Sequence, residues 1–177
     1  KEAVKKFDMS NLRHMCSVGE PLNAEAVLWS QEAFDMMFHD TFWQTETGAN
    51  MITPLPSASL KAGSACKPFP GILADVVDKK GKQVKPGKGG FLVVKHPWPS
   101  MLRTIFNNPK RYIKTYWSDV KGMYFAGDVA FKDKDGYFWV QGRTDDVLKV
   151  AGHRIGTAEV ESSFVAHPSV VECGVIG

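Results

Sequence analysis

The chain has 177 residues, of which 44% are hydrophobic and 23% are charged, and its formal net charge is +3. This composition is typical of a globular protein with room for one fair-sized domain, or for one domain and a fragment of another. The weak positive charge, without a lysine and arginine block interleaved with aromatic residues, predicts no nucleic-acid partner but suits a site for anionic phosphates. The chain contains no 18-residue apolar run, so we expect no membrane span.

The three cysteines, Cys16, Cys66 and Cys173, are odd in number and widely spaced. They match no zinc-binding spacing and predict no disulfide framework. We expect them to be buried free thiols in a reducing compartment, which favours a cytoplasmic protein.

The N-terminal part of the chain indicates an α/β arrangement. A helix is predicted over residues 24–34, with Asn23 as its N-cap. The loop at residues 17–21 precedes this helix, and a short strand predicted at residues 36–39 follows it. Polar residues come directly after that strand, at the place where α/β folds bind their ligands.

The middle of the chain indicates a small antiparallel barrel or sandwich. Prolines and glycines predict an irregular connector over residues 53–71. A short helix is predicted at residues 107–115. Apolar segments separated by turn signals predict strands over residues 72–77, 90–95, 122–125 with 128–131, and 137–141.

The C-terminal pattern indicates the start of an α+β domain. We expect a strand at residues 146–150, a helix at residues 156–167 and an apolar strand at residues 170–177. A buried strand needs neighbours on both faces, and the chain begins with Lys1 rather than Met. We therefore expect a piece of a longer protein that ends inside this domain.

Nine consecutive residues, Asp40–Gly48, combine two carboxylates, an amide, three hydroxyls and two aromatic rings. Burying polar groups without partners costs about 1–3 kcal/mol each, so the segment is either solvated or holds a polar ligand. As a site, Gln44 and Thr45 offer hydrogen bonds to a base or a phosphate, and Glu46 offers a ligand for Mg²⁺. The alternative is a solvated loop with its two aromatic side chains in the core.

Three further segments carry residues suited to a nucleotide. Gly19–Pro21 would let a flat ring approach the backbone, although a simple turn before a helix explains it as well. Asp128 suits a ribose diol, or is a turn aspartate. Arg143 and Arg154 would bind the nucleotide through their guanidinium groups, or lie on the surface beside the aspartates at 145–146.

Four segments match one known family in the same order along the chain, at residues 17–23, 40–56, 124–128 and 142–161. They resemble the acyl-adenylate-forming superfamily, and within it the AMP-forming acetate–CoA ligases. Members join a carboxylate to ATP with release of pyrophosphate, and then transfer the acyl group from the adenylate to CoA. The resemblance implies that residues 1–71 end a large α/β domain, that residues 72–144 form an antiparallel β-barrel-like subdomain, and that residues 145–177 contain the hinge and the start of an α+β C-terminal domain.

The resemblance also implies roles for individual residues. Thr45 and Glu46 would be catalytic, and Glu46 would hold Mg²⁺, with ATP and CoA as substrates. The implied nucleotide-binding residues are Gly19, Glu20, Pro21, Asp40, Thr41, Gln44, Thr45, Asp128, Arg143 and Arg154.

Other implied roles concern the acyl group, CoA and domain motion. Val18 and Trp43 would line the acyl pocket, where the large indole favours acetate over longer acids. Ala151 and Gly152 would border the CoA channel, and Asp145 would be the hinge about which the C-terminal domain turns.

The family's phosphate loop and adenylation lysine do not occur in these 177 residues. We therefore expect missing parts of the parent chain to complete the site, and the isolated chain to be inactive. Two alternatives remain open: a ligase for propionate or a medium-chain acid, and a non-catalytic nucleotide-binding module.

Overall fold

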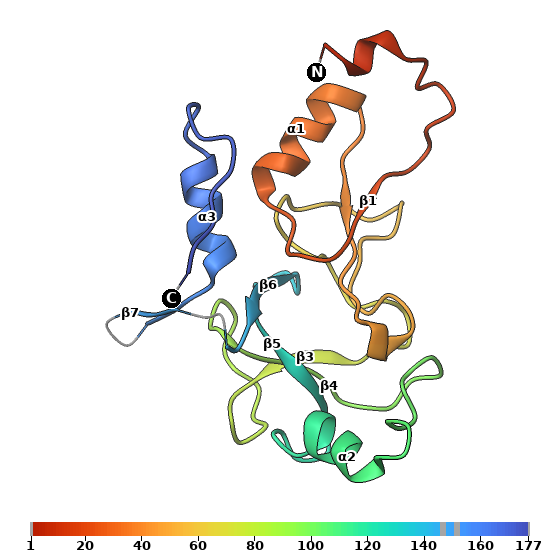
Figure 1. Cartoon of the computed structure of the whole chain (residues 1–177), viewed down its shortest axis with the longest axis vertical. Helices are drawn as coiled ribbons and strands as arrows, with labels where there is room; N and C mark the ends of the chain where they lie inside the picture. The colour runs from red at the N-terminus through yellow and green to blue at the C-terminus, as the bar shows by residue number, and fades with distance from the viewer. Residues whose placement is uncertain (1, 146–147, 151–152, 177) are drawn as a thin grey trace.

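The computed structural model describes residues 2–145, 148–150 and 153–176, apart from the side chains of residues 126, 149, 150, 153, 154 and 158 (Figure 1). No helix in this described part is long and apolar enough to span a bilayer. In chain order the elements are η1 (Val4–Lys6), β1 (Cys16–Ser17), α1 (Ala24–Phe34), β2 (His39–Asp40), η2 (Thr45–Thr47), β3 (Ala74–Val77), β4 (Gly90–Val94), α2 (Pro109–Trp117), β5 (Tyr124–Lys132), β6 (Phe138–Arg143), β7 (Leu148–Val150), β8 (His153–Ile155) and α3 (Thr157–Val165).

The N-terminal part brings two polar segments to the same sheet edge. β1 and β2 pair in parallel with Ser17 opposite Asp40, so the chain leaves both strands at one edge. α1 covers the residues predicted to be helical. The Asn23 side chain caps this helix by accepting a hydrogen bond from the Glu25 N–H at 2.8 Å.

The strand predicted at residues 36–39 is wrong in its bounds, since β2 is His39–Asp40. Asp35 ends α1 in the left-handed conformation, and the chain must turn back before it can pair. The Phe38 N–H donates to the buried Ser30 Oγ at 2.9 Å, which fastens this stretch to the helix. The first residue of the polar segment therefore lies in a strand.

The middle of the chain forms an antiparallel sheet in the order β3–β4–β5–β6. The sheet is open in the described residues and does not close into a barrel, because its two edge strands do not pair with each other. The segments predicted at 122–125 and 128–131 form one strand, β5, which accommodates Gly127 at φ +96° and shifts its register at Val129 and Ala130. α2 begins two residues later than predicted.

A buried carboxylate links β3 to β5 and to the residue that follows β4. Asp75 in β3 is 3% exposed and lies 2.6 Å from the Lys95 Nζ and 2.7 Å from the Lys132 Nζ. Burial alone would raise the pKa of Asp75, but the hydrogen bonds from the two lysines outweigh burial and lower it. The carboxylate therefore stays ionised inside the sheet.

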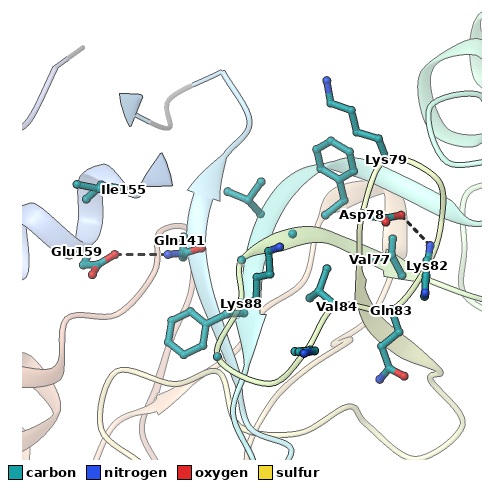
Figure 2. Close-up of a pocket in the computed structure, with 17 residues that line it drawn as sticks. Val77, Asp78, Lys79, Lys82, Gln83, Val84, Lys88, Gln141, Ile155 and Glu159 are labelled. Carbon is teal, nitrogen blue, oxygen red and sulfur yellow. Dashed lines mark hydrogen bonds between the residues drawn. The ribbon is translucent and has the colours of Figure 1, made fainter. Parts of the chain in front are cut away.

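At the C-terminal end, β7 and β8 form an antiparallel hairpin, and α3 follows. Of the strand predicted at residues 146–150, the last three lie in β7 and residues 146–147 lie outside the described residues. α3 is shorter than predicted at both ends. It stands beside β6, where the Gln141 Nε2 donates to the Glu159 Oε2 at 3.4 Å (Figure 2).

The strand predicted at residues 170–177 is wrong for residues 170–176, which form no strand. Val171 and Ile176 are each 95% exposed, and the Val175 N–H donates to the Glu161 Oε1 at 2.9 Å. An apolar strand forms only against neighbours that take up its backbone hydrogen bonds, and the described residues supply no such neighbour here.

The cysteine prediction is confirmed only in part. All three cysteines are free thiols, and Cys66 is buried. Cys16 is exposed, and Cys173 is half-buried. The expectation of three buried thiols is therefore wrong for Cys16, which lies in the two-residue strand β1.

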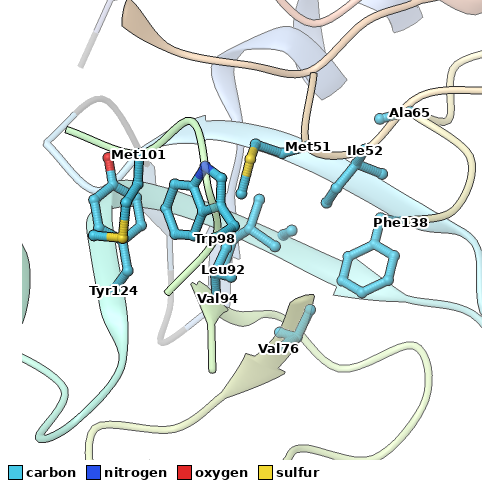
Figure 3. Close-up of a cluster of buried hydrophobic side chains, with 11 residues drawn as sticks. Met51, Ile52, Ala65, Val76, Leu92, Val94, Trp98, Met101, Tyr124 and Phe138 are labelled. Atoms are coloured by element: carbon cyan, nitrogen blue, oxygen red, sulfur yellow. The ribbon is translucent and has the colours of Figure 1, made fainter. Parts of the chain in front are cut away.

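One buried cluster joins the polar segment to the sheet (Figure 3). Met51 and Ile52, which follow the polar segment closely, are each 1% exposed and belong to the same cluster as Phe138 of β6. Trp98 also belongs to the cluster, and its indole N–H donates to the Thr47 carbonyl at 2.9 Å. The polar segment is thus anchored on the same buried core as the antiparallel sheet.

Candidate functional site

A cavity of about 210 Å³ gathers most of the nucleotide-binding residues that the sequence predicts. Its walls come from the loop after β1, from β2 with the polar segment, and from the facing parts of β5 and β6. Of the lining residues, Phe42, Val140 and Gly142 were not among the predicted site residues. The lining residues are Gly19, Glu20, Pro21, Asp40, Thr41, Phe42, Trp43, Gln44, Asp128, Val140, Gly142 and Arg143.

One wall of the cavity follows from the parallel pairing of β1 and β2. The Thr41 N–H and hydroxyl both donate to the Ser17 carbonyl, at 3.0 and 2.6 Å. The Leu22 N–H lies 3.5 Å from the Asp40 Oδ2, so the loop that contains Gly19 is held against β2. Gly19 adopts φ +113°, which a residue with a side chain rarely does, and this lets the loop turn toward the cavity.

Asp40 is a buried carboxyl at the base of this wall. The residue is 9% exposed. Burial raises its pKa from 3.8 to about 6, while the backbone N–H groups of Leu22 and Thr41 oppose the rise. Near neutral pH, Asp40 is therefore an acceptor whose charge is poorly solvated, and it gains from a ligand that donates a hydrogen bond to it.

The opposite wall is a hydrogen-bonded chain across distant parts of the sequence. The Tyr124 hydroxyl donates to the Gln44 Oε1 at 3.0 Å, and the Gln44 Nε2 donates to the Asp128 Oδ2. Asp128 stands opposite Arg143 in the β5–β6 register, and the Arg143 Nη1 lies 3.6 Å from the Asp128 Oδ1. Gln44 thus links the polar segment to the carboxylate–arginine pair.

Asp128 resembles Asp40 in its electrostatics. The residue is 8% exposed, and burial raises its pKa from 3.8 to about 6. The charge of Arg143 opposes that rise, whereas Glu46 adds to it. Arg143 itself is about half exposed, so it can turn toward a ligand in the cavity without being extracted from the core.

Glu46 lies in η2, outside the lining of the cavity. The Tyr116 hydroxyl donates to its Oε1 at 2.8 Å. Burial and this hydrogen bond raise the pKa of Tyr116 to about 12, so the phenol keeps its proton. The Leu102 N–H donates to the Glu46 carbonyl at 2.8 Å, which fixes the backbone separately from the side chain. Thr45, next to it, is exposed.

The donor set around Glu46 fits Mg²⁺ bound together with a phosphate group. In the described part of the chain, no three acidic, histidine or cysteine side chains gather as a protein-only metal site. Mg²⁺ usually binds one or two carboxylates and takes its other ligands from substrate phosphates and water. A single carboxylate near this cavity matches that pattern.

Some predicted site residues are not brought into the cavity. Val18 is 58% exposed and is not part of the lining, whereas Trp43 lines it with 41% of its surface exposed. Asp145 is exposed, and its Oδ1 lies 3.9 Å from the Arg143 Nε. Ala151 and Gly152 lie outside the described residues, and so does the side chain of Arg154.

Sequence reasoning missed the two tyrosines that hold the polar segment, Tyr116 and Tyr124. Tyr124 opens a matched segment, but nothing in its type or spacing distinguishes it from a core residue. Tyr116 lies in α2, 70 residues from its partner Glu46. Neither gives a periodicity or a motif, so only the folded chain shows their role.

A second cavity of about 1130 Å³ lies between the turn that joins β3 to β4 and the start of α3 (Figure 2). Four lysines, at 79, 82, 85 and 88, line it together with backbone glycines and the apolar side chains of Phe91 and Phe131. None of the predicted site residues line this larger cavity. Its lining has no hydroxyl side chain and no buried carboxylate, whereas the smaller cavity has Thr41, Asp40 and Asp128. The smaller cavity is therefore the candidate site.

The chain belongs to the AMP-binding enzyme family, because the family's model matches residues 1–106. Curated relatives extend the match over nearly the whole chain. It is 54% identical to the acetyl-coenzyme A synthetase of Chlorobaculum tepidum, 56% identical to that of Streptomyces coelicolor and 53% identical to that of Methanothrix thermoacetophila.

These alignments cover 99%, 97% and 98% of this chain, in the same order, but 27% of each relative. The chain thus spans about a quarter of the length of the curated relatives that it matches.

A solved structure shares the fold. The crystal structure of the anthranilate CoA ligase AuaEII in complex with anthranoyl-AMP matches with a TM-score of 0.86 at 33% sequence identity. The match covers 97% of this chain and 32% of that chain. The mixed α/β fold is therefore that of part of an adenylate-binding ligase.

Proposed function

We propose that this chain is the adenylate-binding part of an AMP-forming acetate–CoA ligase. The longer protein would form acetyl-AMP from acetate and ATP, release pyrophosphate, and transfer the acetyl group to CoA. The observation that carries the proposal is the cavity in which Gly19–Pro21, Asp40 and the Asp128–Arg143 pair meet. The names of the relatives and the adenylate in the matching ligase structure support it.

The proposed roles follow the chemistry of the two walls. The loop Gly19–Pro21, with Asp40 and Thr41 beside it, would receive the adenine. Asp128, which accepts two hydrogen bonds when ionised, would bind the ribose diol together with Arg143. Gln44 would serve both ligand and protein, because it lines the cavity and already holds the Asp128 carboxylate.

The reaction needs no protein nucleophile, since an acetate oxygen attacks the α-phosphorus and pyrophosphate leaves. The work of the chain is positioning and charge stabilisation. Thr45 would donate to the α-phosphate from its exposed position, and Arg154 would add a cation there. Glu46 would hold Mg²⁺, which neutralises the phosphate charge when it is bound.

The domain organisation is part of the proposal. Residues 1–71 would end the large domain, residues 72–144 would form its β-subdomain, and residues 145–177 would begin the C-terminal domain. Asp145 would be the hinge, and Ala151 and Gly152 would border the CoA channel. A cytoplasmic location belongs to the same proposal and is testable by fractionation of cells that express the tagged, complete protein.

Acetate-dependent exchange of labelled pyrophosphate into ATP tests the function. The complete protein is expected to catalyse this exchange, and the isolated 177-residue chain is expected not to. Absence of exchange by the complete protein with any short acid would reject the ligase. If the chain still bound an acetyl-AMP analogue in calorimetry, the non-catalytic module would then be favoured. Exchange by the isolated chain would contradict its proposed incompleteness.

Trp43 tests the choice of acid, because its indole lines the cavity. In the complete protein, Trp43→Gly is expected to raise kcat/KM for propionate and butyrate relative to acetate by about 10-fold or more, since removing the ring opens space for added methylenes. Trp29→Ala is the control, because Trp29 is similarly exposed but lies on α1, away from the cavity. An unchanged acid profile in Trp43→Gly would favour a ligase whose acyl pocket lies elsewhere.

A further inference from the structure

We propose that Tyr116 is a positioning residue that holds the Glu46 carboxylate in the orientation required for the metal of the bound nucleotide. This inference rests on the proposed function and assigns α2 a part in it. Its basis is the hydrogen bond of 2.8 Å from the Tyr116 hydroxyl to the Glu46 Oε1.

The hydrogen bond occupies only one of the two carboxylate oxygens. Among the described residues, no side chain or backbone donor reaches the Glu46 Oε2 within hydrogen-bond distance. One carboxylate oxygen is thus tied to the protein, and the other accepts no hydrogen bond from the described residues. A second group that orients a ligating carboxylate in this way typically contributes about 10–100-fold to metal affinity.

Tyr116 is itself held rigidly. Its ring stacks on that of Tyr124, with centroids 5.6 Å apart and planes at 11°. Tyr124 is 4% exposed and belongs to the buried cluster, and its hydroxyl donates to Gln44. The two stacked tyrosines therefore hold Glu46 and Gln44 through one hydrogen bond each, and the buried Tyr124 anchors the pair to the core.

The backbone around Glu46 is fixed without Tyr116. The Leu102 N–H donates to the Glu46 carbonyl, and Trp98 and Ser100 both donate to the Thr47 carbonyl, at 2.9 and 2.8 Å. Removing only the Tyr116 hydroxyl keeps the ring stack and these bonds. The expected consequence is confined to the carboxylate.

The test uses Tyr116→Phe in the complete protein, with Tyr112→Phe as the matched control. Tyr112 lies one turn earlier on α2 and donates to the Leu102 carbonyl at 3.1 Å, so the control also loses one tyrosine hydrogen bond. The dissociation constant of ATP is measured by calorimetry with and without Mg²⁺. The Mg²⁺ concentration for half-maximal pyrophosphate exchange is measured at saturating ATP.

In Tyr116→Phe, the factor by which Mg²⁺ tightens ATP binding is expected to fall about 10-fold, and the half-maximal Mg²⁺ concentration to rise by a similar factor. Binding of ATP without Mg²⁺ and the melting temperature should stay close to those of the parent. Tyr112→Phe should resemble the parent in all four quantities. In a protein that already carries Glu46→Gln, adding Tyr116→Phe should change neither the factor by which Mg²⁺ tightens ATP binding nor the half-maximal Mg²⁺ concentration.

Three results would overturn the inference. An unchanged Mg²⁺ dependence in Tyr116→Phe would show that the carboxylate needs no orientation. Tighter metal binding would show that the phenol competes with the metal. An equal shift in Tyr112→Phe would show that the effect passes through the helix as a whole. Failure of the proposed function is distinguishable, because the parent protein itself would then show neither exchange nor tightening of ATP binding by Mg²⁺.

Discussion

Asp40 and Asp128 bring two carboxyl groups into one small cavity, and burial raises the pKa of each to about 6. A carboxylate that is short of solvent binds donor groups strongly, which is what an adenine amino group or a ribose diol offers. The same burial works against the folded chain while the cavity is empty. Under the proposed function, the free energy of unfolding and the affinity for the nucleotide would therefore depend on the same two residues.

The destabilisation by the buried Asp40 carboxylate should appear in the pH dependence of the free energy of unfolding. Below pH 3.8 the folded and unfolded chains both carry the protonated carboxyl, so the group does not destabilise the fold. Between pH 3.8 and about 6 only the unfolded chain releases the proton, and the free energy of unfolding falls as the pH rises. Above pH 6 the loss is complete.

Asp40→Asn removes this titration. Its stability relative to the parent chain is expected to increase from pH 4 to pH 6 by at most about 3 kcal/mol and then to stay constant. Urea unfolding at a series of pH values measures it. Asp78→Asn is the control of opposite sign, because backbone hydrogen bonds lower the pKa of Asp78 and its contribution is lost as the pH falls. A pH-independent difference for Asp40→Asn would show that the carboxyl is solvated.

Gly48 ends the polar segment under two constraints. It adopts φ +68°, and a Cβ there would lie 2.2 Å from the Ser100 carbonyl oxygen. Gly48→Ala is expected to destabilise the chain by about 2–4 kcal/mol, because a left-handed residue and a backbone clash add together. Gly87→Ala is the control that separates backbone strain from the clash. Gly87 has φ +79° but open space around it, so this variant should be destabilised by only about 1–2 kcal/mol. Equal losses, measured by urea unfolding, would show that the segment moves away from Ser100 at little cost.

At the scale of elements, the buried Asp75 joins β3 to Lys132 of β5 and to Lys95 just after β4. Asp75→Asn keeps the shape of the side chain but leaves two lysines facing each other without a negative charge. We expect it to destabilise the chain by about 2–4 kcal/mol. Glu2→Gln is the control, because the exposed Lys5–Glu2 pair should contribute about 0–1 kcal/mol. A loss in Asp75→Asn no larger than in the control, measured by thermal and urea unfolding, would contradict the role of the carboxylate.

The elements that the sequence predicts well are those decided locally. Asn23 and the residues after it determine α1, and turn residues with apolar alternation determine the positions of β3 to β6. The prediction fails where pairing decides the outcome. Residues 36–38 are apolar, but the Phe38 N–H donates to Ser30 of α1. Residues 170–176 are mostly apolar, but they have no strand to pair with in the described part of the chain.

The candidate site follows the same division. Its residues could be proposed because carboxylate, amide, glycine and arginine are chemically suited to a nucleotide. Their assembly could not be derived from spacing, since Gln44 and Asp128 are 84 residues apart and meet only through the β1–β2 and β5–β6 pairings. Tyr116 carries no chemical signal at all, because a phenol in an amphipathic helix is ordinary.

At the scale of the whole molecule, the hydrophobic core continues across the proposed domain boundary at residue 71. Met51 and Ile52, from the N-terminal side, are packed in one cluster with Val76 and Phe138 from the other side. The Ala65 N–H also donates to the Phe138 carbonyl at 3.0 Å. A buried cluster shared in this way makes two segments one cooperative unit.

A polypeptide of residues 1–71 is therefore expected to show no cooperative unfolding transition, whereas residues 1–144 should show one. Cutting at residue 71 exposes Met51 and Ile52 to water and removes the partners of the connector, so too little apolar surface remains buried to balance the entropy of ordering the chain. Far-UV circular dichroism in urea measures both transitions.

Phe138→Ala in the polypeptide of residues 1–144 should lower its free energy of unfolding by about 3–5 kcal/mol. Because the cluster is shared, hydrogen-exchange protection should fall together around β2 and around β3. A sigmoidal transition in residues 1–71 alone, or loss of protection confined to the sheet, would mean that the polar segment is held by its own side of the molecule.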